Sequence, residues 1–156
     1  MAHLTYLSLG ANLGPKEENL HAAIKMIQEQ VGDIVLRSAF YVTAPWGFQS
    51  GNDFLNAVVA VSTKLTPIQL LDKTQHIECA LGRVHKTLCG VYSDRMIDID
   101  ILSVDQLTIQ TERLVLPHPL LHLRRFVLEP LCEIAPDWVH PVLGKRADVL
   151  LSALES

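Results

Sequence analysis

The chain has 156 residues, of which 49% are hydrophobic and 19% are charged, so a single globular domain over residues 1–156 can bury a sizeable core. Its 13 basic and 17 acidic residues give a formal charge of −4, which argues against a nucleic-acid-binding protein that relies on a basic surface. No apolar run approaches the roughly 18 residues of a membrane span, and the N-terminus shows no secretory signal, so we expect a cytoplasmic protein.

The first half of the chain alternates between strand and helix patterns. Residues 4–10 predict a strand that ends at a loop rich in Gly and Asn. From residue 16 to residue 31 the apolar side chains recur at helical spacing, and Gly32 is suited to the end of that helix. Two further strands are predicted over residues 34–42 and 54–63, and the second has the nearly continuous apolar character of an interior strand.

The second half completes a recognisable order of elements. A helix is predicted from Thr66 as N-cap to a stop at Gly82, and a strand follows over residues 97–102. A small hairpin is expected over residues 106–116, followed by a segment interrupted by five prolines and a short helix after Arg146. The core order β-α-β-β-α-β predicts an α+β fold of the ferredoxin-like type, in which an antiparallel sheet carries two helices on one face.

Two aspartates in the last predicted strand are the most informative residues. Strict alternation places Asp98 and Asp100 on one face of that strand, with Cα atoms about 6.6 Å apart. Aspartate disfavours strands, and two neighbouring carboxylates repel each other unless a cation binds there. A solvent-facing strand edge is the alternative, but the pattern favours Mg²⁺ or Mn²⁺ bridging the carboxylates to substrate phosphates.

Basic residues near this strand are candidates for binding phosphate. They are Arg83, His85, Lys86, Arg95, His118, Arg124 and Arg125. Scattered surface charge explains any one of them, but Arg83 and Arg95 flank a loop that leads into the aspartate strand, and residues 87–94 of that loop are expected to act as a lid. The chain has neither a P-loop nor a G-x-G-x-x-G motif, so nucleotide binding would depend on side chains.

Two phenylalanines and an asparagine suggest a site for a flat heterocycle. Phe54 and Asn56 begin the interior strand, and Phe126 follows the Arg124-Arg125 pair. Aromatic rings supply stacking faces, and an amide recognises hydrogen-bond donors and acceptors at the edge of a ring. Taken alone, however, each phenylalanine fits a core position better.

Together these segments resemble the 6-hydroxymethyl-7,8-dihydropterin pyrophosphokinase family of folate biosynthesis. The resemblance runs nearly end to end, and its motifs are residues 10–13, 40–47, 53–57, 75–83, 95–100 and 117–131. It implies transfer of an intact pyrophosphoryl group from ATP to the pterin hydroxymethyl oxygen, with release of AMP. The chain departs from the family pattern at Ser93-Asp94 and at His85, which lie in or beside the predicted lid.

The resemblance also implies roles for individual residues. Two Mg²⁺ ions would be held by Asp98 and Asp100, which together with Arg83 and Arg95 form the expected catalytic set. ATP would be bound by the residues that match the family's nucleotide site: Leu71, Gln75, Glu78, Arg83, Arg95, Ile101, His118 and Arg124. The pterin would be bound by two stacking rings and by polar groups at its edges: Phe54, Phe126, Asn56, Asp98 and the backbone around Thr43, Ala44 and Trp46.

Two alternatives share these features. A small-molecule kinase that moves only the γ-phosphoryl group would release ADP instead of AMP. A non-catalytic pterin- or nucleotide-binding module with a ferredoxin-like fold would turn neither ligand over. For the expected enzyme the partners are ATP and the pterin, with no nucleic acid and no membrane, and the chain is expected to be a monomer.

Overall fold

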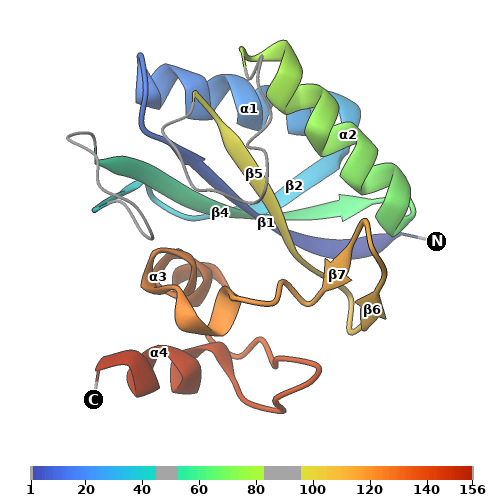
Figure 1. Cartoon of the computed structure of the whole chain (residues 1–156), viewed down its shortest axis with the longest axis vertical. Coiled ribbons are helices and arrows are strands. Elements are labelled where there is room, and N and C mark those ends of the chain that lie inside the picture. The colour runs from blue at the N-terminus through green and yellow to red at the C-terminus, as the bar shows by residue number, and fades with distance from the viewer. Residues whose placement is uncertain (1, 45–52, 83–95, 156) are drawn as a thin grey trace.

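The protein is built around one antiparallel sheet (Figure 1). The computed structural model describes residues 2–44, 53–82 and 96–155. Its sheet runs in the order β2-β4-β1-β5, with β3 beside β4. The strands are β1 (His3–Ala11), β2 (Gly32–Arg37), β3 (Tyr41–Thr43), β4 (Phe54–Thr63) and β5 (Asp98–Val104). Together with the helices on the sheet, this strand order confirms the predicted ferredoxin-like α+β fold.

Helices cover both faces of the sheet, as Figure 1 shows. On one face lie α1 (Lys16–Gln30) and α2 (Pro67–Ala80), and on the other lie α3 (Arg125–Ile134) and α4 (Ala147–Glu155). Each face has its own apolar core, so Ile99 and Ile101 pack beneath α1 and α2, whereas Leu102 packs beneath α3 and α4. Because neighbouring residues of a strand face opposite sides, Asp98 and Asp100 lie on the side of the sheet that α3 covers.

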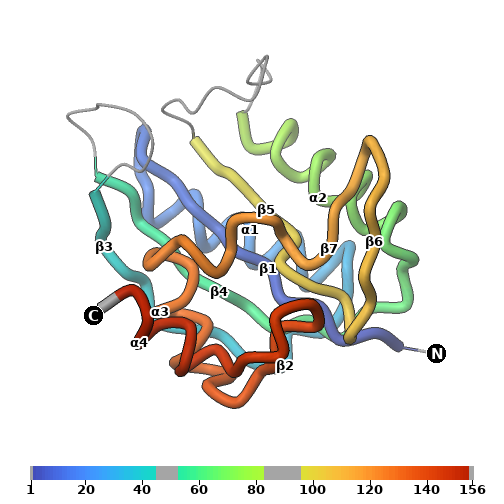
Figure 2. Tube along the Cα trace, turned by 60° about the horizontal axis from the view of Figure 1, so that its bottom comes forward, coloured from blue at the N-terminus to red at the C-terminus, as the bar shows by residue number. Residues whose placement is uncertain are grey.

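A short hairpin and a turn connect β5 to α3 (Figure 2). The hairpin consists of β6 (Ile109–Gln110) and β7 (Val115–Leu116), and a 3₁₀ turn, Leu121–Leu123, precedes α3. Between them the chain returns to the sheet, where the backbone N–H of His118 donates to the carbonyl of Leu102 at 2.9 Å. This bond holds His118 beside β5, the strand at one edge of the sheet.

Most predicted elements are confirmed, and α2 shows why. The hydroxyl of Thr66 accepts the N–H of Gln69 at 3.2 Å, and the Gln69 side chain accepts the N–H of Thr66 at 2.9 Å. This reciprocal pair satisfies two N–H groups that otherwise lack a helical partner. After the helix, Gly82 has a φ of +105°, which suits glycine and ends the helix as predicted.

The predicted continuous strand over residues 34–42 is wrong, because the chain leaves the ladder between β2 and β3. There the N–H of Ser38 donates to the carbonyl of Val58 at 3.0 Å, and its hydroxyl accepts the N–H of Val58 at 2.9 Å. The hydroxyl of Ser38 thus accepts the Val58 N–H in place of a backbone carbonyl of a neighbouring strand. Gly32 directly follows the C-cap of α1, as predicted, and it also begins β2, where a Cβ would lie 2.0 Å from the carbonyl oxygen of Ser62.

Helix α3 was not predicted from the sequence. Pro130 lies inside it and cannot donate the backbone hydrogen bond that a helix requires at this position. Burial of Val127, Leu128 and Leu131 on one face compensates for the missing bond. Among the described helices, none is long and apolar enough to cross a membrane.

Candidate active site

A row of four residues crosses the α3-facing side of the sheet. Asn56 of β4 and Asp98 of β5 both lie opposite Gly10 of β1, and Tyr41 of β3 lies opposite Asn56. Gly10 has no side chain, and Oδ1 of Asn56 lies over it, since a Cβ there would be only 2.8 Å from that oxygen. The fold therefore brings the predicted heterocycle-binding amide and a predicted metal ligand to opposite sides of this position without a side chain, which we call the hollow above Gly10.

The side chain of Asn56 is held in a defined orientation. It is buried, and its Nδ2 donates a short hydrogen bond to Oγ1 of Thr43. The other end of the amide, Oδ1, is the atom nearest to the space above Gly10. In the same corner Phe54 lies opposite Thr43 in the strand pairing. The structure thus brings together three residues predicted for the heterocycle site, with Ala44 following directly after β3.

The start of α3 supplies the residues that face this sheet edge. Arg124 is only 4% exposed, and its Nη1 lies 3.7 Å from Oδ2 of Asp100. The centre of its guanidinium lies 5.5 Å from the centre of the Phe126 ring. Burial lowers the pKa of Arg124, but an arginine remains protonated in a protein. A fixed positive charge therefore lies between a predicted metal ligand and a predicted stacking ring.

His118 lies beside β5, the strand that carries both aspartates. Its Nδ1 accepts the N–H of Leu120 at 3.2 Å, which leaves the proton of the neutral ring on Nε2. Burial lowers the pKa of His118, and the charge of Asp98 acts in the opposite direction. The net lowering of the pKa favours the neutral imidazole, whose Nε2 can donate a hydrogen bond.

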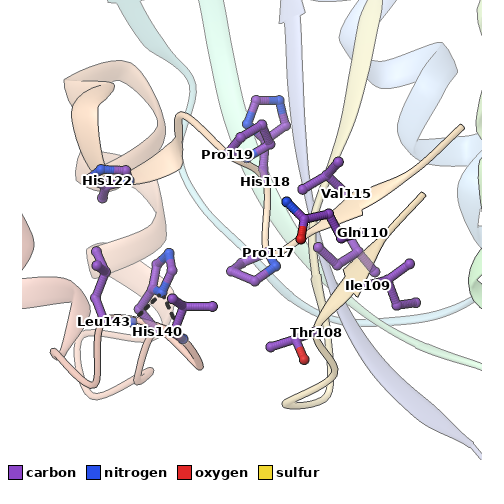
Figure 3. A pocket seen from close by; sticks show the side chains of 12 residues that line it. Thr108, Ile109, Gln110, Val115, Pro117, His118, Pro119, His122, His140 and Leu143 are labelled. Atoms are coloured by element: carbon purple, nitrogen blue, oxygen red, sulfur yellow. Dashed lines mark hydrogen bonds between the residues drawn. The ribbon is translucent and has the colours of Figure 1, made fainter. Parts of the chain in front are cut away.

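A cavity of about 370 Å³ opens beside His118, between the β6–β7 hairpin and the turn after Trp138 (Figure 3). His122 and His140 also line it, with ring centres 5.9 Å apart. The Nδ1 of His140 accepts the N–H groups of Val142 and Leu143, drawn as dashed lines in Figure 3. Of the predicted site residues that the structure describes, His118 is the one that lines this cavity.

The remaining predicted ATP residues lie on the other side of β5. Leu71, Gln75 and Glu78 follow one another at helical spacing on α2, and the Ile101 side chain is part of the core beneath that helix. Glu78 is buried at 6% exposure, and its Oε2 accepts the N–H of Ile99 at 2.7 Å. The predicted ATP residues therefore lie on both sides of β5, with this outermost strand between them.

Several predicted residues lie outside the described parts of the chain. They are Trp46, Arg83, His85, Lys86, Arg95 and the predicted lid over residues 87–94. Within the described parts, no group of three or more His, Cys, Asp or Glu side chains gathers as a metal site. Asp98 and Asp100 still fit Mg²⁺, because this ion commonly takes one or two protein carboxylates and completes its shell with phosphates and water.

Gly10 has a place in the site that its sequence pattern does not predict. The loop signature predicts that the first strand ends at Gly10, whereas the structure places Gly10 inside β1, in pairing with strands on both sides. A glycine within a strand pattern is a signal of close approach by another group. That signal was present in the sequence and identifies the position where the hollow forms.

Comparison with known proteins gives a consistent result. The family model for 7,8-dihydro-6-hydroxymethylpterin-pyrophosphokinase matches residues 6–136. The chain is 50% identical over 139 residues to a 2-amino-4-hydroxy-6-hydroxymethyldihydropteridine pyrophosphokinase of Porphyromonas gingivalis, covering 88% of this chain and 94% of the relative. It is 47% identical over 135 residues to the enzyme of the same name from Methylorubrum extorquens, covering 86% and 84%.

A solved structure shows the same fold. The crystal structure of wild-type Plasmodium falciparum HPPK-DHPS superposes with a TM-score of 0.80 at 17% identity. The match covers 98% of this chain and 45% of that protein, so the chain spans less than half of its length. At this identity the likeness concerns the fold alone.

Proposed function

The chain belongs to the 7,8-dihydro-6-hydroxymethylpterin-pyrophosphokinase family, and on this premise we propose which residues carry out its reaction. The protein is an ATP-dependent pyrophosphokinase of folate biosynthesis that transfers the pyrophosphoryl group of ATP to 6-hydroxymethyl-7,8-dihydropterin. The alternatives of a γ-phosphoryl kinase and of a non-catalytic binding module are not favoured.

In this proposal the pterin occupies the hollow above Gly10. Phe54 and Phe126 flank the ring, and Oδ1 of Asn56 accepts a hydrogen bond from its edge. The proposal is supported by the bond from Asn56 to Thr43, which turns the acceptor end of the amide toward the hollow. The backbone around Thr43, Ala44 and Trp46 supplies the other edge contacts expected from the family.

Asp98 and Asp100 are the proposed ligands of two Mg²⁺ ions. When bound, the ions would neutralise the triphosphate and lower the pKa of the attacking hydroxyl group. Support comes from the shared face of the two carboxylates and from the position of Asp98 opposite Gly10, next to the proposed pterin. The single observation that carries the proposal is this placement of Asp98 and Asn56 on either side of Gly10.

ATP is proposed to bind across β5. Residues of α2 and the backbone at Ile101 would hold the adenosine portion, while His118 and Arg124 would contact the phosphates with Arg83 and Arg95. The pterin oxygen would attack the β-phosphorus, so that a new O–P bond forms and the bond to the α-phosphate oxygen breaks. The arginines would stabilise the negative charge that this exchange moves toward AMP.

We also propose that residues 1–156 act as one catalytic domain. The family match over residues 6–136 and the packing of α4 against α3 support this organisation. We propose that the chain acts as a monomer, which size-exclusion chromatography with light scattering would test. We place the reaction in the cytoplasm, where ATP is available.

One assay tests the proposed reaction directly. The purified protein is mixed with ATP, Mg²⁺ and 6-hydroxymethyl-7,8-dihydropterin, and the nucleotides are separated, with controls that lack pterin or contain EDTA. We expect AMP that depends on pterin and disappears with EDTA. ADP as the product would contradict pyrophosphoryl transfer, and pterin binding without any nucleotide product would contradict catalysis.

A further inference from the structure

Glu133, near the end of α3, binds two donors from the segment that leads into β3. Its Oε1 accepts the hydroxyl of Tyr41 at 2.6 Å. Its two carboxylate oxygens lie 3.1 and 3.0 Å from the backbone N–H of Ala39. One side chain of the helix therefore holds both the start of β3 and the backbone before it, and Figure 2 shows β3 beside α3.

The segment before β3 depends on such contacts because it lies outside the strand ladder. Ser38 is fixed to Val58 of β4 by two hydrogen bonds. The next N–H, that of Ala39, is bound by a carboxylate instead of a strand carbonyl. Ser38 and Glu133 thus determine where the chain re-enters the sheet.

The point of re-entry matters for the proposed pterin site. Tyr41 pairs with Asn56 in the strand ladder. Two residues later, the hydroxyl of Thr43 accepts a hydrogen bond from the side-chain amide of Asn56. The opposite wall, Phe126, is on the first turn of α3, the helix that carries Glu133. A link between β3 and α3 therefore sets the distance between the residues that would read the edge of the pterin and the ring that would stack on it.

We propose that Glu133 is a positioning residue for the pterin substrate, acting through Tyr41 and Ala39 to hold β3 against α3. This inference rests on the proposed function of the site and adds a residue that does not itself touch the substrate. A carboxylate presents two charged acceptor oxygens to these donors, whereas an amide presents one neutral acceptor oxygen. The bond to Glu133 also raises the pKa of Tyr41 to about 12, so the hydroxyl remains a donor at physiological pH.

The prediction is a selective effect on pterin binding. Glu133 is exposed, and exposed polar contacts add little to global stability, so its loss should leave the protein folded. In Glu133→Ala we expect the KM for pterin to rise about tenfold, less than the roughly hundredfold cost of an ångström-scale misplacement. The KM for ATP should change less than about twofold, since none of the described ATP residues lies on β3 and only Arg124 adjoins α3.

Conservative variants sharpen the test. Glu133→Gln keeps one acceptor and should recover part of the pterin affinity, and Tyr41→Phe should lose part of it by removing a single hydroxyl. Glu129→Ala is the matched control, because it removes another carboxylate of α3 whose ion-pair partner, Arg125, belongs to the same helix. If Glu133→Ala fails to fold, the pterin affinity of Tyr41→Phe alone tests the positioning role.

Pterin affinity should also be measured by calorimetry, which does not require turnover. A wild-type protein that binds pterin without forming AMP would overturn the proposed reaction but would still allow the effect of Glu133 to be measured. An unchanged pterin affinity in both Glu133→Ala and Tyr41→Phe would overturn the positioning role. Equal losses for pterin and ATP would also overturn it, because they indicate a general structural contact.

Discussion

The carboxylate of Glu78 accepts the backbone N–H of Ile99 at 2.7 Å, at the residue between the two site aspartates. Strand β5 lies at one edge of the sheet, so within the described parts of the chain no strand lies beside this N–H to accept it. A side chain from α2 takes the place of such a strand and closes the edge. The bond holds the backbone from which Asp98 and Asp100 project.

Removal of this acceptor should be costly for stability. Glu78→Ala leaves a buried N–H without its carboxylate, and we expect the free energy of unfolding to fall by about 1–3 kcal/mol. Glu78→Gln retains an acceptor oxygen and should lose less. Urea unfolding of both variants measures the difference, and equal stability of Glu78→Ala and wild type would show that water or another group replaces the bond.

A methyl group at Gly10 should damage the site more than the fold. The added Cβ of Gly10→Ala would lie 2.8 Å from Oδ1 of Asn56, so the amide must move out of the hollow. An overpacked site costs about 1–3 kcal/mol, and we expect most of this cost to appear as weaker pterin binding in calorimetry. A lower melting temperature with unchanged pterin affinity would contradict the assignment of the hollow.

Loss of the Asp100 carboxylate should abolish most of the activity. We expect Asp100→Ala to lower kcat at least about a hundredfold, as does removal of other groups that stabilise transition-state charge. Asp148→Ala, which removes an exposed carboxylate paired with Arg146, should keep wild-type activity. Initial rates of AMP formation at saturating Mg²⁺ measure both variants, and wild-type-like turnover of Asp100→Ala would refute the metal assignment.

The ring of Phe126 should contribute to pterin affinity. Stacking of an aromatic side chain on a base is worth about 1–3 kcal/mol, so Phe126→Ala should weaken pterin binding by that amount and leave ATP binding nearly unchanged. Phe126→Leu keeps an apolar side chain without a ring and serves as the control. If Phe126→Leu binds pterin as tightly as wild type, the ring provides packing only.

Stability should fall in mild acid because of His140. Burial, followed by the neighbouring His122, lowers the pKa of His140, whereas the unfolded side chain takes up a proton near pH 6.5. The unfolded state therefore binds more protons as the pH falls below about 6.5, and the melting temperature should decrease until the folded pKa is passed. In this pH interval the melting temperature of His140→Gln should change less with pH than that of wild type or of His76→Gln. Equal pH dependence in all three proteins would contradict the assignment of the acid effect to His140.

The elements with strong local signals were predictable from the sequence. The capping box at Thr66 and the alternation of Asp98 and Asp100 both depend on neighbours within a few residues. Helix α3 was missed, because a proline inside it carries a local cost that only burial against the sheet compensates. The break between β2 and β3 was missed for a similar reason, since Ser38 finds its partner twenty residues further along the chain.

Within the site, the residue types were easier to predict than their environment. The resemblance to the family predicts that Asn56 and Asp98 belong to the site. Only the strand register shows that both lie opposite Gly10. The burial of Glu78 likewise depends on how α2 meets β5. Such relationships arise from tertiary pairing, and no local pattern encodes them.

The hollow above Gly10 has a consequence for the amount of folded protein. The sheet is covered by α3 and α4 along part of this face, and in the proposed complex the pterin completes the covering. A ligand that binds only the folded state stabilises it by RT ln(1 + [L]/Kd), about 2.7 kcal/mol when its concentration is a hundred times Kd. Supply of the substrate would then protect its own enzyme against unfolding and degradation.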